Sequence, residues 1–197
     1  MTLKPYIVGL GGTTRPNSSS ERLTKAVLNA VEERGAETQL FDGAYLASLP
    51  HYAPENPERI LAQTTLVAAL RRADGIIIGS PSYHGSISGL VKNALDQVED
   101  MRKDARVYFD GLPVGLIVTS AGWQGGGITL SAMRDMVHAL RGWPTPVGIT
   151  VNSIEQAVFA PDGTILDAAV LKAIHAQADQ LLAFSRQKAP ALTELAS

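Results

Sequence analysis

Two apolar runs place the strongest limit on how this chain can fold. They are GIIIGS, residues 75–80, and PVGLIVTS, residues 113–120. Neither run alternates regularly between apolar and polar residues, so both faces of each predicted strand must be covered by other parts of the chain. Strands of this kind lie at the centre of a parallel sheet, with helices packed on both of its sides.

The rest of the chain alternates between strand-like and helix-like stretches. The predicted strands are 6–12, 37–42, 75–80, 113–120 and 145–151, and the predicted helices are 19–34, 57–73, 88–103, 128–141 and 167–187. A turn at Asp162-Gly163 predicts a small hairpin over residues 159–165. We therefore expect one α/β domain over residues 1–197. Its fold is predicted to be a flavodoxin-like three-layer sandwich, whose five-stranded parallel sheet has the order 2-1-3-4-5.

Composition narrows the class of protein further. The 197 residues suffice for one domain with a sizeable core, and the absence of cysteine excludes disulfides and cysteine-ligated metals. A net charge of -2 provides no general attraction to nucleic acid or to an anionic membrane. The chain shows no signal-peptide pattern and no apolar run near the roughly 20 residues that cross a bilayer, which predicts a cytoplasmic protein.

Three segments that follow predicted strands have a shared composition. They are GGTTRPNSSS (11–20), GSPSYHGSISG (79–89) and TSAGWQGGG (119–127), all rich in Gly, Ser and Thr. Ligands of open α/β sheets bind outside the carboxyl ends of the strands, where the strand order reverses. In the order 2-1-3-4-5 that point lies between strands 1 and 3, so we expect these three segments to meet there.

The first segment predicts a phosphate site. It leads into a helix N-terminus, whose free N–H groups and positive dipole end favour an anion. Hydroxyl groups and one guanidinium add donors, from Thr13, Arg15, Ser18 and Ser20. The alternative is that a serine merely caps the helix. The chain lacks a complete G-x-G-x-x-G/A pattern and any Gly-Lys pair, so the monophosphate of FMN is favoured over a dinucleotide or a nucleoside triphosphate.

The second and third segments are predicted to hold the flavin ring. Pro81 is expected to end the third strand, and main-chain N–H groups beyond it would reach ring oxygens and nitrogens. The predicted ring-binding residues are Pro81, Ser82, Tyr83, His84, Gly85, Ser86, Ser120, Gly122 and Trp123. Each aromatic residue also has a purely structural interpretation: Tyr83 and Trp123 would then pack their own loops, and His84 would be an exposed loop residue.

Two motifs resemble those of the NADPH-dependent FMN reductase family. Family members carry G-S/T-x-R-x-x-S-x-N/S, which is similar to residues 12–20 here, and P-x-Y-x-G-S-x-S-G-x-x-K-N-x-x-D, which is similar to residues 81–96. The resemblance extends from about Tyr6 to Phe184. The chain departs from the pattern at Ser82, where many relatives have glutamate, and at Ser20, where many have asparagine.

The resemblance implies an NAD(P)H:FMN oxidoreductase that takes FMN and NADPH (or NADH). It also implies a homodimer or homotetramer, built partly from the helix after the second segment, whose apolar stripe is Val91, Ala94, Leu95 and Val98. The branch that the chain looks closest to supplies reduced FMN to sulfonate-cleaving monooxygenases. No catalytic side chain and no metal site is predicted, since hydride transfer to a flavin requires alignment rather than an acid–base pair.

Two other functions fit the same fold. The first is an FMN-dependent reductase of quinones, azo dyes or metal oxyanions. The second is a non-enzymatic electron carrier of the flavodoxin type. Carriers are usually strongly acidic around the flavin, and the balance of 17 basic and 19 acidic residues argues against that function.

Overall fold

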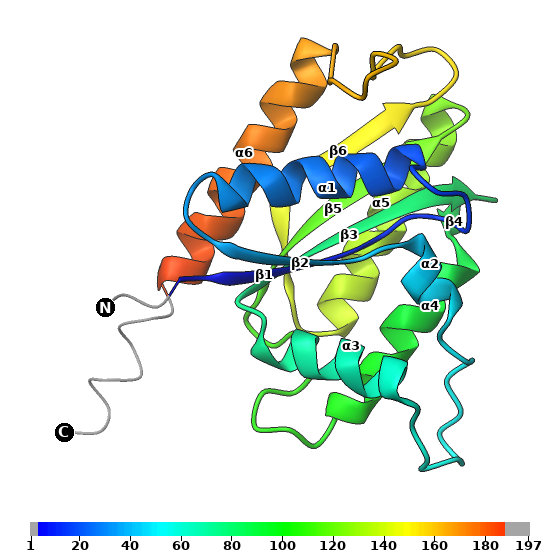
Figure 1. Ribbon diagram of the computed structural model, residues 1–197, viewed down its shortest axis with the longest axis vertical. Coiled ribbons are helices and arrows are strands. Elements are labelled where there is room, and N and C mark those ends of the chain that lie inside the picture. Colours follow the sequence, from blue (N-terminus) through cyan, green and yellow to red (C-terminus); the bar gives the residue numbers. More distant parts are fainter. Residues whose placement is uncertain (1–3, 188–197) are drawn as a thin grey trace.

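The computed structural model describes residues 4–187, and a parallel sheet of five strands runs through its centre (Figure 1). The strands are β1 (Tyr6–Gly11), β2 (Glu37–Phe41), β3 (Gly75–Tyr83), β5 (Pro113–Ser120) and β6 (Trp143–Asn152). Their order is β2-β1-β3-β5-β6, which confirms the predicted flavodoxin-like order. A short strand that was not predicted, β4 (Ser86–Ile87), pairs antiparallel with the end of β3.

Helices cover both faces of the sheet, as the doubly apolar strands require. One face carries α1 (Ser19–Glu32) and α6 (Ala168–Gln187); the other carries α2 (Gly43–Ala47), α3 (Leu61–Arg72), α4 (Gly89–Asp96), a 3₁₀ turn (Gln97–Met101) and α5 (Trp123–Ala139). The side chains of β3 show why. Ile76 and Ile78 point into one core and Ile77 points into the other, and all three are almost fully buried.

Several predicted boundaries were wrong for local reasons. Pro81 does not end the third strand: β3 continues to Tyr83, with Pro81 opposite Thr119 of β5. Pairing with β1 stops at Gly79, so β3 has an open side there, where a residue without an N–H is tolerated. The predicted helix 88–103 is shorter, because α4 tightens into the 3₁₀ turn after Asp96.

Two differences concern the connection after β2. The helix α2 was not predicted; Asp42 caps it by accepting a hydrogen bond from the Tyr45 N–H at 2.8 Å. The helix predicted from Pro57 begins only at Leu61. Arg59 lies before it and is held by Asp100 of the 3₁₀ turn, with Nε–Oδ2 and Nη2–Oδ1 distances of 2.7 and 2.9 Å. Arg59 is thus fixed to the 3₁₀ turn immediately before Ile60, the N-cap residue of α3.

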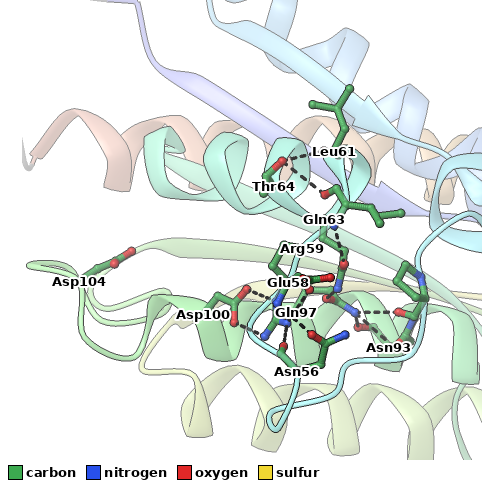
Figure 2. A network of polar contacts seen from close by, with 12 residues as sticks. Asn56, Glu58, Arg59, Leu61, Gln63, Thr64, Asn93, Gln97, Asp100 and Asp104 are labelled. Carbon is green, nitrogen blue, oxygen red and sulfur yellow. Dashed lines mark hydrogen bonds and ion pairs between the residues drawn. The ribbon is translucent and has the colours of Figure 1, made fainter.

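Residues 49–60, here called the proline segment, are fixed by a buried polar network (Figure 2). The Asn93 side chain accepts a hydrogen bond from the Tyr52 N–H and donates to the carbonyls of Leu49 and Pro50. Gln97 donates to the Pro50 carbonyl and accepts from the Gln63 side chain at 2.7 Å. Asn93, which belongs to the family-like motif, is therefore a structural residue.

The predicted apolar stripe, which runs from α4 into the 3₁₀ turn and is here called the α4 stripe, lies in the core of this chain. Val91, Ala94, Leu95 and Val98 are all buried, from 0% to 7% exposed, without any partner chain. The expectation that this stripe builds a subunit interface is therefore wrong. Lys92 and Asp96, on the solvent side of the same helix, form an i,i+4 ion pair of 2.6 Å.

The remaining predicted elements agree with the structure to within two residues, apart from the helix predicted at 128–141, which begins at Trp123. Phe159 and Ile165 form an antiparallel bridge around the Asp162-Gly163 turn, as expected for the small hairpin. The strand predicted at 145–151 extends one or two residues further at each end. Within residues 4–187, no helix has the length and apolar character needed to cross a membrane.

Candidate cofactor site at the carboxyl edge of the sheet

A cleft of about 490 Å³ opens where the carboxyl ends of β1, β3, β5 and β6 meet. Its lining residues are Thr13, Thr14, Arg15, Ser18, Ser19, Ser20, Pro81, Ser82, Tyr83, Thr119, Ser120, Ala121 and Ser153. Hydroxyl groups dominate this set, and one guanidinium joins them. The three Gly/Ser/Thr-rich segments therefore come together at the switch point, as the sequence predicts.

The first segment ends as a capped helix start. The Ser18 hydroxyl accepts a hydrogen bond from the Glu21 N–H at 3.4 Å, and the Ser18 carbonyl accepts from the Arg22 N–H at 2.9 Å. Those two donors are therefore used, while the N–H groups of Ser19 and Ser20 in the first turn have no intrahelical partner. The serine cap that was predicted as an alternative to ligand binding therefore exists at Ser18. It leaves the N–H groups of Ser19 and Ser20 as two donors at the cleft.

Two glycines allow α1 to lie very close to the sheet beneath this helix start. A Cβ at Gly11 would come within 2.6 Å of the Thr24 hydroxyl, and one at Gly79 would overlap the same oxygen. Thr24 in turn donates to the Ser20 carbonyl at 2.9 Å. Gly11 of the first segment and Gly79 of the second thus serve helix packing, and the first turn of α1 is held firmly at the floor of the cleft.

The second segment is a tight β-hairpin. Tyr83 pairs with Ser86, and the two residues between them, His84 and Gly85, have φ angles of +53° and +79°. Positive φ at both central positions defines a type I′ turn. Tyr83 and Ser86 pair to close the hairpin, so the N–H groups of the two turn residues, His84 and Gly85, are not needed for that pairing.

The third segment is helical earlier than predicted. Residues 123–127 form the first turns of α5, since Gly122 is the N-cap residue. The Ser82 hydroxyl contacts the Thr129 hydroxyl at 2.7 Å and donates to the Gly125 carbonyl at 3.1 Å, which fastens α5 to the end of β3. Trp123 donates its indole N–H to a carboxylate oxygen of Glu155 at 2.8 Å and remains 53% exposed.

Eight of the predicted site residues line the cleft: Thr13, Arg15, Ser18, Ser20, Pro81, Ser82, Tyr83 and Ser120. His84, Gly85, Ser86, Gly122 and Trp123 do not line it and lie in the segments that border it. Sequence reasoning missed Ser153, which follows β6 and donates to the Ser120 carbonyl from both its N–H and its hydroxyl. The sequence signal that could have found it is its position two residues after the strand predicted at 145–151.

The donor set of the cleft fits a phosphate ester joined to a larger polar and aromatic body. The groups that would suit a phosphate are the first turn of α1, the hydroxyls of Ser18 and Ser20, and Arg15, which forms no ion pair within residues 4–187. The size lies within the range of roughly 300–1,000 Å³ that is usual for small-molecule sites. The cleft residues therefore fit FMN.

The fold and this cleft define the class: a flavodoxin-like α/β protein with a hydroxyl-lined cleft at its topological switch point. Known structures have the same fold. A flavoenzyme NAD(P)H:(acceptor) oxidoreductase from Paracoccus denitrificans superposes with a TM-score of 0.75 over 94% of this chain and 98% of its own, at 21% identity. An NADH:FMN oxidoreductase in its apo form gives 0.69 over 95% and 92%, at 19% identity. At these identities the likeness shows the fold.

Sequence comparison gives the family. The profile of the NADPH-dependent FMN reductase family matches residues 5–156, so the chain belongs to that family. An FMN-dependent NADPH-azoreductase of Staphylococcus saprophyticus is 32% identical over 155 residues, 73% of this chain and 75% of the relative. The enzyme of the same name from Staphylococcus aureus is 31% identical over 157 residues. The predicted family, enzyme class and use of FMN and NADPH are confirmed.

Proposed function

We propose that this NADPH-dependent FMN reductase binds FMN in the cleft with the phosphate at the first turn of α1. The observation that carries the proposal is the hydroxyl-lined cleft at the switch point. Arg15 would form charge-assisted hydrogen bonds to the phosphate, and Thr13, Ser18 and Ser20 would complete its shell. The Thr13 hydroxyl already accepts the Arg15 N–H at 3.1 Å, which fixes the loop that carries the guanidinium.

The same proposal places the flavin ring between the second and third segments. Pro81, Ser82, Tyr83 and Ser120 line the cleft there, and the type I′ turn at His84-Gly85 and the start of α5 at Gly122-Trp123 border it. Ser86 acts through the hairpin, because its pairing with Tyr83 fixes the turn.

When bound, FMN supplies the redox chemistry by accepting a hydride from NADPH and passing electrons onward. The chain's own part is to align the reactants and to stabilise developing charge. The N–H groups of the hairpin turn and of the start of α5 can donate to a ring edge without changing protonation state. We therefore propose that no side chain of this protein takes or gives a proton in the hydride step.

Two electron acceptors are proposed. The first is a flavin-dependent monooxygenase that receives reduced FMN, supported by the resemblance in the two motifs. The second is an azo compound or quinone reduced at the cleft itself. The names of the staphylococcal relatives favour this second candidate, as do the half-exposed rings of Tyr83 and Trp123, each 53% exposed, beside the cleft.

A homodimer or homotetramer in the cytoplasm remains part of the proposal. The α4 stripe no longer supports assembly. Ile60 and Leu61 do, because they are 51% and 81% exposed at the start of α3, and neighbouring exposed apolar side chains mark interaction surfaces. Light scattering at micromolar concentration tests this: a monomer mass would contradict assembly.

The deciding experiment is steady-state turnover of the purified protein with NADPH. Rapid NADPH oxidation with free FMN as the acceptor supports reductase activity, and its absence with every acceptor would leave only an electron carrier. Turnover with an azo dye and with a quinone, each with FMN held at one concentration, then separates the two acceptors. Release of reduced FMN, followed through its reaction with oxygen outside the protein, supports the monooxygenase partner.

A further inference from the structure

A groove leads away from the cofactor cleft along the outer side of α1. A hollow of about 230 Å³ shares Ser19 and Ser153 with the cleft, and a second hollow of about 500 Å³ shares Arg22 and Phe159 with the first. The second hollow lies between α1 and the 159–165 hairpin. The three spaces therefore adjoin in a row, and the two outer ones are here called the α1 groove.

The α1 groove carries two cations on one side of the helix. Arg22 and Lys25 are three residues apart on α1 and both line the larger hollow. The structure describes no ion pair for either of them within residues 4–187. Lys25 is exposed and Arg22 is partly buried, so both charges are available to an anion that enters the groove.

Arg22 is held in a fixed orientation. Its guanidinium carbon lies 3.8 Å from the centre of the Phe159 ring, which is the geometry of a cation–π contact. Such stacking uses the flat face of the guanidinium and leaves its N–H groups pointing outward in the plane. Those N–H groups suit a bidentate contact with a phosphate, and the stacked ring lowers the entropy cost of ordering the side chain.

One carboxylate lines the groove, and it is already engaged. Asp162 accepts a hydrogen bond from the Thr164 N–H at 2.9 Å. That bond is the main reason why the pKa of Asp162 is lowered, and the attraction to Arg22 contributes less. Asp162 therefore belongs to the hairpin turn, and the groove keeps a net positive charge from Arg22 and Lys25.

The hairpin tip lies directly against Arg22. A Cβ at Gly163, which has a φ of +97°, would be 3.3 Å from an Nη atom of Arg22. A glycine at this position thus satisfies the left-handed turn and also leaves room for the guanidinium. The hairpin and the cation form one wall of the groove.

We propose that the α1 groove binds the phosphorylated adenosine half of NADPH, with Arg22 and Lys25 contacting its 2′-phosphate. This inference rests on the proposed function, because it takes NADPH as the reductant at the adjoining cleft. The 2′-phosphate is the group that distinguishes NADPH from NADH. Two cations that meet it in the groove make NADPH the preferred donor.

The test is calorimetric binding to the FMN-loaded protein. The probes are adenosine 2′,5′-bisphosphate and 5′-AMP, which differ by the 2′-phosphate. We expect the bisphosphate to bind wild type at least tenfold more tightly. Arg22→Gln and Lys25→Gln should each reduce this ratio at least fivefold, and Lys103→Gln, an exposed lysine on the other side of the sheet, should leave it unchanged. Equal ratios in wild type and in both groove variants would overturn the proposal.

Two further measurements keep the outcomes separate. Lys25 is exposed, so Lys25→Gln remains decisive even if Arg22→Gln loses the Phe159 contact and unfolds the hairpin. The ratio of the KM values for NADH and NADPH should fall at least fivefold in the Lys25 variant. If wild type oxidises both dinucleotides with FMN and the ratio does not move, only the groove assignment fails. If wild type oxidises neither, the proposed function fails.

Discussion

The cofactor cleft and the proline segment are both rich in polar groups, yet they use them in opposite ways. At the proline segment, the network residues Asn93 and Gln97 are buried, and their hydrogen bonds go to main-chain groups and to the Gln63 side chain of the same chain. In the cleft, Arg15 is exposed without an ion pair among residues 4–187, and Ser19 and Ser20 keep free N–H groups.

The difference teaches how to distinguish a polar residue that folds the chain from one that receives a ligand. A buried amide whose partners all belong to its own chain stabilises the native state, because removing it leaves those partners unsatisfied. A donor at the mouth of a cleft contributes little to folding and becomes useful when an anion arrives. Sequence motifs do not separate the two, since Asn93 and Arg15 both belong to family-like motifs.

The largest expected effect is on folding. Asn93→Leu removes the acceptor of the Tyr52 N–H and the donor to the Leu49 and Pro50 carbonyls. We expect the free energy of unfolding to fall by about 2–4 kcal/mol. Urea denaturation measures it. The neighbouring Lys92→Ala, which breaks an exposed ion pair, should cost less than about 0.5 kcal/mol. If Asn93→Leu instead weakens FMN binding strongly while the free energy of unfolding is unchanged, Asn93 is a ligand-binding residue and the contrast between the two regions is wrong.

The next effect is on binding. Arg15→Ala should weaken FMN by about 1.5–3 kcal/mol, because a charge-assisted contact to the phosphate is lost. Riboflavin, which lacks the phosphate, should bind the variant and the wild type alike. Fluorescence titration of both ligands gives the two affinities. Equal losses for FMN and riboflavin would contradict the phosphate assignment.

A third prediction concerns the hairpin turn. Gly85→Val should reduce NADPH:FMN turnover more than tenfold at saturating FMN, because a β-branched residue does not tolerate a φ of +79°. A Cβ at this position would lie 3.4 Å from the Ile128 side chain, which is an ordinary contact, so the backbone conformation is the expected obstacle. Gly85→Asn, which tolerates this φ better, should retain most of the activity.

The same experiment includes His84→Ala, which should stay within about tenfold of wild type, or roughly 1.4 kcal/mol of barrier. Circular dichroism checks that each variant is folded. An inactive His84 variant beside a normal Gly85→Val would mean that histidine chemistry, rather than main-chain donors, operates at the flavin ring.

The smallest effect should appear in acid. The hydrogen-bonded Arg59 guanidinium lowers the pKa of the Asp100 carboxyl below its ordinary value near 4. A lowered pKa contributes stability above the unfolded-state value, and this contribution is lost as the pH falls through the folded-state value. Because the pair is partly exposed, the loss should be below about 1 kcal/mol. Unfolding of Asp100→Asn should depend less on pH below 4 than wild type, and an identical dependence would contradict this.

The sequence predicted the sheet order and the meeting of three segments because both follow from strongly patterned runs. The apolar stretches 75–80 and 113–120 had to lie centrally, and loops after parallel strands share one edge. The sequence did not predict the start of α3. The residue before its N-cap, Arg59, pairs with Asp100, and such a contact between residues 41 positions apart cannot be read from a local pattern. Ser153 follows a predicted parallel strand and could have been found by the same edge rule, whereas its hydrogen bond to the Ser120 carbonyl appears only in the folded sheet.

The burial of the α4 stripe shows a related limit. Helical spacing identifies an apolar face and does not say what covers it. Val91 and Val98 pack into the chain's own core rather than against a second subunit. A single domain over the whole chain, the ligand roles of individual site residues and the absence of a catalytic side chain remain predictions.

The close approach of α1 to the sheet at Thr24 makes the helix sensitive to tilting. Its far end is anchored by Arg34, which bonds the Ala30 carbonyl and pairs with Asp179 of α6 at 2.7 Å. A methyl group added at Gly79 would lift α1 at Thr24 while that anchor stays in place, so the helix would pivot and its first turn would swing away from β3. The position of the first turn of α1, where we propose that the phosphate binds, therefore depends on a residue beneath the helix that has no side chain.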